Sequence, residues 1–233
     1  MAEPVAPGGL GAPVSAGPVR PTRRYPYLSR PDGIYRDSFA TIRAETDLSR
    51  FTPEESVVAV RMVHAAGDTG LVDDVAFHPR LVESARTALR AGAPILTDAQ
   101  MIASGITRRR LPADNEVRCL LHDARATELA RAWGTTRSAA AVSLWGDALE
   151  GAVVAIGNAP TALFHLLELV ADGGPRPAAV IGIPVGFIGS AESKEALAAN
   201  PYDLPWLVVH GRRGGSALCV AAVNALATED ELA

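Results

Sequence analysis

Hydrophobic residues recur at two spacings along the chain from residue 33 onward. Apolar positions three and four apart are typical of amphipathic helices, whereas short apolar runs between turn residues are typical of buried strands. The pattern predicts helices over residues 33–45, 53–66, 79–91, 125–133, 136–149, 161–170, 191–199 and 216–227. It predicts strands over residues 94–97, 117–121, 152–156, 178–183 and 206–209.

Strands that alternate with helices along the chain are typical of crossover connections between parallel strands. We therefore predict an α/β fold that is doubly wound. Its mostly parallel sheet should have about five strands and carry helices on both faces.

The helix predicted over 53–66 has the clearest boundaries. Thr52 can cap its start, with Pro53 at the first helical position and Glu55 placed to close a capping box. Gly67 then follows as a residue that tolerates a left-handed end. Within this helix, Arg61 and His64 are three residues apart and so share one face.

Residues 1–31 differ from the rest of the chain because they hold seven of the 17 prolines and four glycines. Such a segment buries too little apolar surface to offset the entropy of ordering it. We predict a disordered tail over 1–31 and a single α/β domain over 32–233.

Composition narrows the classes of function. The formal net charge is −4, and the basic run at 108–110 is too isolated to form a nucleic-acid surface. The two cysteines, Cys119 and Cys219, lie among apolar residues and fit neither a disulfide framework nor a zinc site. No run of 18 uncharged apolar residues is present, and no signal sequence is recognisable at the start. We expect a cytoplasmic protein that binds no nucleic acid, no membrane and no metal.

Four turns that lead into helices are candidates for ligand binding, because ligands of open α/β sheets bind beyond the carboxyl ends of the strands. Free backbone N–H groups at such helix starts can bind anions, and the turn over 211–216 adds two guanidinium groups that suit carboxylates. We predict a pocket for a ligand with several negative groups, contacted by Arg137, Gly157, Asn158, Thr161, Gly189, Ser190, Gly214, Gly215 and Ser216. Each turn can equally be only the tight connection that the fold needs. The glycine spacings match neither the dinucleotide fingerprint nor a phosphate-binding P-loop.

The five histidines are too widely separated to indicate a metal cluster. His64 is the most interesting of them, since it lies in the last helical turn, where the helix dipole favours the protonated imidazole. Arg61, one turn earlier, could hold an acidic ligand beside it. A structural role for His64 remains the alternative at this point.

Several separated motifs together resemble one family. They are SFATIRAE at 38–45, VRMVHA at 60–65, GAPILTD at 92–98 and TRSAA at 136–140, with the turns at 156–161, 186–194 and 211–216. This set is similar to the precorrin-8X methylmutases of cobalamin biosynthesis. The resemblance runs from Asp32 to Ala227 and leaves out the proline-rich tail.

The resemblance implies a methyl shift from C-11 to C-12 of the tetrapyrrole precorrin-8X, which gives hydrogenobyrinic acid without any cofactor. It implies that His64 is the catalytic general acid, that Ser38, Arg61 and Arg137 contact the substrate, and that the protein is a homodimer. The carboxylates of the substrate are the anions for which the turns provide donors.

Two other functions are open alternatives. A tetrapyrrole carrier would bind the same ring without converting it, and a nucleotide-dependent oxidoreductase follows from fold analogy alone. The residues do not tell whether the substrate is metal-free or contains cobalt. The wording of the motifs favours the metal-free form.

Overall fold

The structure, a computed structural model, describes residues 17–18, 22, 25–27 and 30–229. Most of the predicted tail over 1–31 therefore lies outside the described residues. Helix α1 (Pro31–Glu45) begins at the end of that segment, two residues earlier than predicted.

The described residues form a six-stranded sheet in the order β1-β6-β5-β4-β2-β3. The strands are β1 (Val75–Phe77), β2 (Ile95–Thr97), β3 (Val117–Cys119), β4 (Val153–Ile156), β5 (Ala179–Gly182) and β6 (Trp206–Val209). Strands β2 to β6 pair in parallel, whereas β1 pairs antiparallel with β6. The predicted α/β class and mostly parallel sheet are confirmed. The sheet has one strand more than predicted, because β1 is a short strand formed by antiparallel pairing with the distant β6.

The remaining helices connect the strands. They are α2 (Pro53–Ala66), α3 (Leu81–Arg90), α4 (Gln100–Gly105), α5 (Ala124–Trp133), α6 (Arg137–Ser143), α7 (Pro160–Ala171), α8 (Ser190–Ala198) and α9 (Ser216–Leu226). Three short 3₁₀ turns accompany them: η1 (Thr69–Asp74), η2 (Arg108–Arg110) and η3 (Gly146–Leu149). The single helix predicted over 136–149 is wrong in extent, because α6 ends before a 3₁₀ turn.

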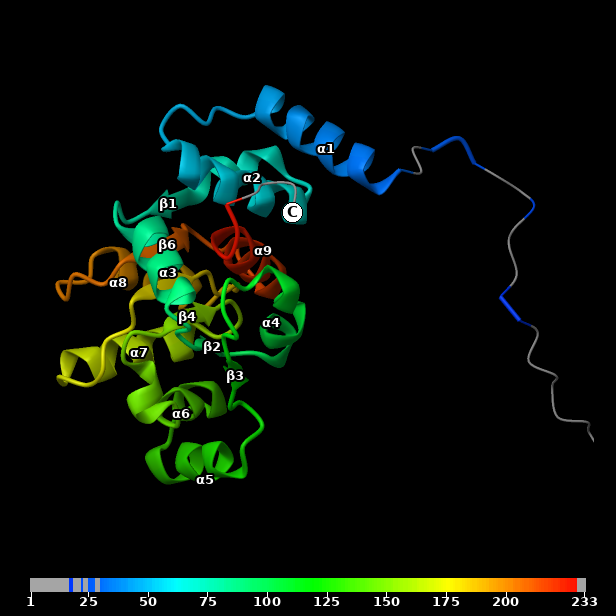
Figure 1. The fold of residues 1–233 in the computed structure, drawn as a ribbon. Coiled ribbons are helices and arrows are strands. Elements are labelled where there is room, and N and C mark those ends of the chain that lie inside the picture. Colours follow the sequence, from blue (N-terminus) through cyan, green and yellow to red (C-terminus); the bar gives the residue numbers. More distant parts are fainter. Residues whose placement is uncertain (1–16, 19–21, 23–24, 28–29, 230–233) are drawn as a thin grey trace, which may run out of the picture.

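Successive residues of the central strands face opposite sides of the sheet and form two apolar cores. Val153 and Ala155 of β4 pack with residues of α2, α3, α4 and α9. Val154 and Ile156 pack with residues of α6, α7 and α8. Helices therefore cover both faces, as predicted, and α1 lies across the outside of α2 (Figure 1).

The ends of α2 follow the predicted signals. The Thr52 hydroxyl accepts a hydrogen bond from the Glu55 N–H, and the Glu55 carboxylate accepts one from the Thr52 N–H. Gly67 ends the helix in the left-handed conformation, with φ of 64°. These caps fix where α2 stops, and so place His64 in its last turn.

The two edges of the sheet carry different turns. We call the ends of β2 to β6 the carboxyl edge and their beginnings the amino edge. The His210 N–H donates to the Asp74 carbonyl at the carboxyl edge, so the end of η1 lies there as well. The neighbouring strands β2 and β4 have connections that run in opposite directions along the sheet, which makes the carboxyl edge between them the topological switch point.

Candidate active site

His64 is held by a serine and two aromatic rings of α1. The Ser38 hydroxyl lies 2.9 Å from Nδ1 of His64. The rings of Tyr35 and Phe39 lie 5.6 Å and 5.2 Å from the imidazole, measured between centroids. Within residues 30–229 no hydrogen bond engages Nε2 of His64. When Ser38 donates to Nδ1, Nε2 carries the ring proton and is the nitrogen that can donate it.

Arg61 belongs to the same cluster. Its side chain is buried, and its guanidinium carbon lies 5.5 Å from the Phe39 ring, which His64 also contacts edge-on. A cation over an aromatic face is favourable and fixes the position of the guanidinium. The structure thus brings together Ser38, Arg61 and His64, which the resemblance had grouped.

The turn after β4 binds a carboxylate of the protein itself. Asp98, which follows β2, accepts hydrogen bonds from the N–H groups of Gly157, Asn158 and Ala159 at 3.0, 3.1 and 2.7 Å. Asp98 is buried, and this burial raises the pKa of its carboxyl although the three N–H groups oppose the rise. The expectation that these N–H groups are free for a ligand is wrong, since Asp98 occupies the anion position at the switch point.

The turns after β5 and β6 brace each other. The buried Ser190 hydroxyl donates to the Pro184 carbonyl at 2.8 Å, and the Gly215 N–H donates to the Ile183 carbonyl at 2.9 Å. A Cβ at Gly214 would stand 2.4 Å from the Ile183 oxygen, so no side chain fits there. The Gly215 N–H is therefore engaged, contrary to the expectation that the N–H groups of this turn are free for a ligand, and the Ser190 hydroxyl donates within its own turn.

The two guanidinium groups of the turn after β6 have different roles. Arg213 forms ion pairs with Asp68 and Asp74 at 3.4 and 3.3 Å and donates to a carbonyl of η1. Arg212 forms no ion pair with a described residue and lies over the Phe187 ring. The expectation that both guanidinium groups suit ligand carboxylates is wrong for Arg213, whose charge is already neutralised.

A buried lysine forms a hydrogen bond with the backbone of the turn after β6. Lys194 of α8 is fully buried, and its Nζ donates to the Arg213 carbonyl at 2.6 Å. Burial lowers the pKa of Lys194 to about 8, although the carboxylate of Asp74 acts in the opposite direction. The lysine therefore carries its charge in a poorly solvated place.

Arg137 and Thr161 lie further along the carboxyl edge, at the starts of α6 and α7. Thr136 caps α6 by accepting from the Ala139 N–H, and its hydroxyl lies 2.8 Å from that of Thr161. The side chain of Arg137 is exposed. A Cβ at Gly157 would stand 3.1 Å from the Gly215 carbonyl oxygen, so the turn after β4 packs closely against the turn after β6.

A cavity of about 320 Å³ opens between the end of α2 and these turns. It is lined by Ala65, Ala66, Asp68, Leu71, Val185, Arg213, Gly214, Ala217 and Leu218. Ala65 and Ala66 follow His64 on α2, so the cavity lies between the end of the helix that carries His64 and the turns after β5 and β6. Ser216, the first residue of α9, precedes the lining residue Ala217.

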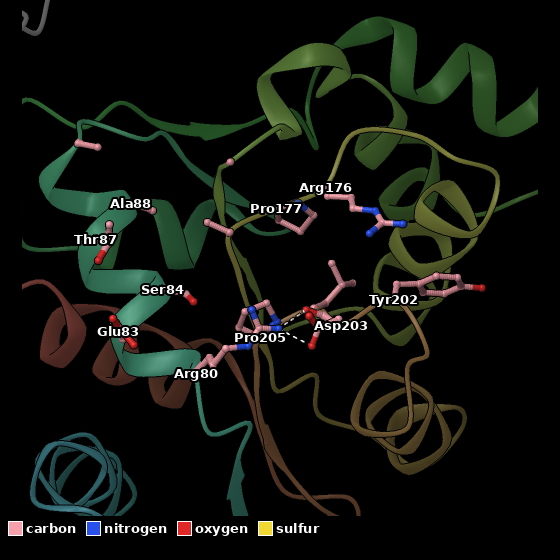
Figure 2. A pocket seen from close by; sticks show the side chains of 14 residues that line it. Arg80, Glu83, Ser84, Thr87, Ala88, Arg176, Pro177, Tyr202, Asp203 and Pro205 are labelled. Atoms are coloured by element: carbon pink, nitrogen blue, oxygen red, sulfur yellow. Dashed lines mark hydrogen bonds and ion pairs between the residues drawn. The ribbon is translucent and has the colours of Figure 1, made fainter.

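A larger hollow, about 720 Å³, lies at the amino edge. Figure 2 shows Glu83 and Thr87 of α3 on one side and Arg176 on the other, with Asp203 between them. Arg80 and Asp203 neutralise each other there by an ion pair. This hollow contains none of the predicted site residues and no histidine, so we place the candidate active site at the carboxyl edge despite its smaller cavity.

No group of three or more His, Cys, Asp or Glu side chains among the described residues is arranged to hold a metal ion. None of the described helices combines the length and the apolar character needed to cross a membrane.

Comparison with known proteins assigns the chain to a family. The family model of precorrin-8X methylmutase matches residues 33–229. The chain belongs to the precorrin-8X methylmutase family. A relative named precorrin-8X methylmutase in a Sinorhizobium species is 59% identical over 87% of this chain and 97% of the relative. One of the same name in Pseudomonas aeruginosa is 54% identical over 88% of this chain and 99% of the relative.

A solved structure supports the assignment. The precorrin-8X methylmutase of Thermus thermophilus superposes with a TM-score of 0.76 and 43% identity, over 84% of this chain and 94% of that chain. As a member of the precorrin-8X methylmutase family, the protein is an isomerase of cobalamin biosynthesis whose reaction moves a methyl group.

Sequence reasoning missed three contributors to the site. Asp98 carried a usable signal, because it follows a buried strand at the edge where the turn after β4 also lies. Lys194 stands in a helix start rich in small residues, and no pattern distinguished it from a surface lysine. Tyr35 is one turn before Ser38 on α1, so a face shared with Ser38 was the available signal.

Proposed function

We propose that the protein moves a methyl group from C-11 to C-12 of metal-free precorrin-8X to give hydrogenobyrinic acid, with His64 as general acid and no cofactor. The observation that carries this proposal is the hydrogen bond between Ser38 and Nδ1 of His64, which leaves Nε2 to face a ligand. The names of the two relatives above support the metal-free substrate.

In the proposed reaction, Nε2–H of His64 donates its proton to a ring nitrogen near the migrating methyl group. The protonated macrocycle is poorer in electrons, which lowers the barrier to the shift of the methyl group between adjacent carbons. The proton then returns to Nε2, so that no atom is gained or lost in the isomerisation. A positioned general acid typically accelerates a reaction by about 10²- to 10⁴-fold.

Arg61 and Arg137 are proposed to bind carboxylates of the substrate, since guanidinium groups bind carboxylates bidentately. The Ser38 hydroxyl can bond to His64 and to the substrate at the same time, because a hydroxyl has one donor and two acceptor positions. At the turn after β4, the N–H groups are taken by Asp98, so Asn158 is proposed to act through its side-chain amide.

The remaining predicted contacts fall in two groups. Thr161 is proposed to offer its hydroxyl at the start of α7. The residues Gly189, Ser190, Gly214, Gly215 and Ser216, together with Gly157, are proposed to shape the wall against which the ring lies. Their engaged donors give this wall a fixed form.

We also propose that the protein is a homodimer and acts in the cytoplasm. Sedimentation of the purified chain tests the first statement, because a monomer at assay concentration would contradict it. Fractionation of the source cells tests the second.

The deciding experiment follows the absorption spectrum of precorrin-8X with purified protein. Wild type should convert the substrate catalytically, and His64→Ala should bind it but turn it over about 10²- to 10⁴-fold more slowly. His122→Ala, which removes an exposed histidine, is the matched control and should keep full turnover. A stoichiometric spectral shift with wild type would instead identify a carrier, and undiminished turnover by His64→Ala would refute the general acid.

A further inference from the structure

The turn between β5 and α8 exposes large apolar side chains. Phe187 is 82% exposed and Ile188 is 91% exposed, the highest values among the large apolar residues that the structure describes. Val185, in the same turn, is 47% exposed and also lines the cavity beside α2. Apolar groups gathered at one exposed place mark a surface that binds something.

The base of this turn is tied down, so the exposed tip has a defined position. Ser190 and Gly215 hold the carbonyls of Pro184 and Ile183 by the hydrogen bonds described above. Gly214 packs against the same two carbonyls too closely for a side chain. A rigid base under a solvent-exposed apolar tip is a platform rather than a loose loop.

A cation accompanies the apolar tip. The guanidinium carbon of Arg212 lies 5.2 Å from the centroid of the Phe187 ring. The Arg212 carbonyl accepts a hydrogen bond from the Gly186 N–H at 3.3 Å, which couples the two turns. The tip therefore offers an apolar surface with a positive charge at its side.

This combination matches the chemistry of one occupant. A tetrapyrrole has large apolar faces and carries its carboxylates around the rim. We propose that Phe187 and Ile188 form the platform on which one face of the substrate ring rests, and that Arg212 binds a carboxylate at its rim. The proposal rests on the proposed function, because it assigns this surface to the same substrate.

The first experiment titrates the protein with hydrogenobyrinic acid and follows the absorbance of the ring. The double variant Phe187→Ser/Ile188→Ser should weaken binding about tenfold or more, since it removes two apolar contacts. KM should rise accordingly, while kcat changes little. Phe187→Tyr keeps the ring and should bind as wild type does.

Tyr202→Ser is the matched control, because Tyr202 is an aromatic residue in a turn of the amino edge (Figure 2). It should bind hydrogenobyrinic acid as wild type does. The replaced residues of the double variant are exposed, so its thermal unfolding should be unchanged, and unfolding is recorded alongside each titration.

A second experiment separates stacking from charge. Arg212→Met should weaken binding of hydrogenobyrinic acid and make it less sensitive to salt, but should not change binding of the same ring with its carboxylates converted to amides. The double variant should weaken binding of both rings.

Three results would overturn the proposal: wild-type affinity in the double variant, an equal loss in Tyr202→Ser, or a change of oligomeric state in the double variant with unchanged binding per subunit. The last would assign the tip to a contact between protein chains. Failure of the proposed function would give a different result. Wild type would then fail to convert precorrin-8X, whether or not it binds hydrogenobyrinic acid.

Discussion

The two edges of the sheet differ in the burial and pairing of their charged residues as well as in the volume of their cavities. The amino edge has the larger hollow, about 720 Å³ against about 320 Å³, yet its Arg80 and Asp203 neutralise each other near the surface. The carboxyl edge has a smaller cavity, but it also has the hydrogen-bonded Ser38–His64 pair at the end of α2 and three buried ionisable residues, Arg61, Asp98 and Lys194. Burial of ionisable groups beside a cleft indicates function better than volume does.

The largest effect that we expect in this comparison is on stability, at Asp98. Asp98→Ala leaves three N–H groups of the turn after β4 without their acceptor and should lower the free energy of unfolding by about 3–5 kcal/mol. Urea denaturation measures this. Asp203→Asn, at the amino edge, removes a charge from an exposed ion pair and should cost less than about 1 kcal/mol. Equal losses of unfolding free energy in Asp98→Ala and Asp203→Asn would show that the two edges do not differ in how much their carboxylates stabilise the fold.

The next effect is a pH dependence caused by Lys194. Its folded pKa, about 8, is below the usual 10.5, so the folded state binds fewer protons than the unfolded state between these values. The penalty for burying the charge is fully present below pH 8 and disappears as pH rises towards 10.5. As pH rises from about 8 to 10.5, the free energy of unfolding of wild type should therefore increase by about 1–2 kcal/mol relative to that of Lys194→Met.

Urea denaturation at several pH values from 7 to 10.5 provides the measurement. Parallel curves for wild type and Lys194→Met would show that Lys194 titrates normally.

A smaller effect concerns the Ser38–His64 hydrogen bond. Ser38→Ala should reduce turnover about fivefold, which corresponds to about 1 kcal/mol for one hydrogen bond that orients the imidazole. Ser38→Thr keeps a hydroxyl and should recover most of the activity. Initial rates with precorrin-8X distinguish the two, and a Thr variant as slow as the Ala variant would argue against orientation through the hydroxyl.

The smallest effect is expected at the amino edge. Arg176 is exposed there, and Arg176→Ala should change turnover by less than about twofold, as is usual for surface substitutions away from a site. Kinetics with precorrin-8X provide the test. A loss of tenfold or more would move the substrate site to the larger hollow.

Local signals predicted the fold well where they act within one element. The capping box at Thr52 and the left-handed Gly67 depend on residues a few positions apart, and both are confirmed. Strand β1 was missed because its three residues gain their structure from pairing with β6, 130 to 134 positions away. Pairing at that distance leaves no periodic trace in the sequence.

The candidate site was predictable in position but not in the state of its donors. Gly157 and Asn158 were correctly expected at the carboxyl edge, since they follow a strand and precede a helix. That their N–H groups are occupied depends on Asp98, which lies 59 residues earlier in the chain. The same limit applies to Arg213, whose partners belong to η1.

Helix α1 has a consequence for the order in which the protein is made. Tyr35, Ser38 and Phe39, which surround His64, all precede the first strand in the chain (Figure 1). His64 and the three residues of α1 that contact it are therefore synthesised before any strand of the sheet. The helical pair that carries the proposed general acid therefore comes early in the chain, and the turns after β5 and β6, with the proposed platform for the ring, come last.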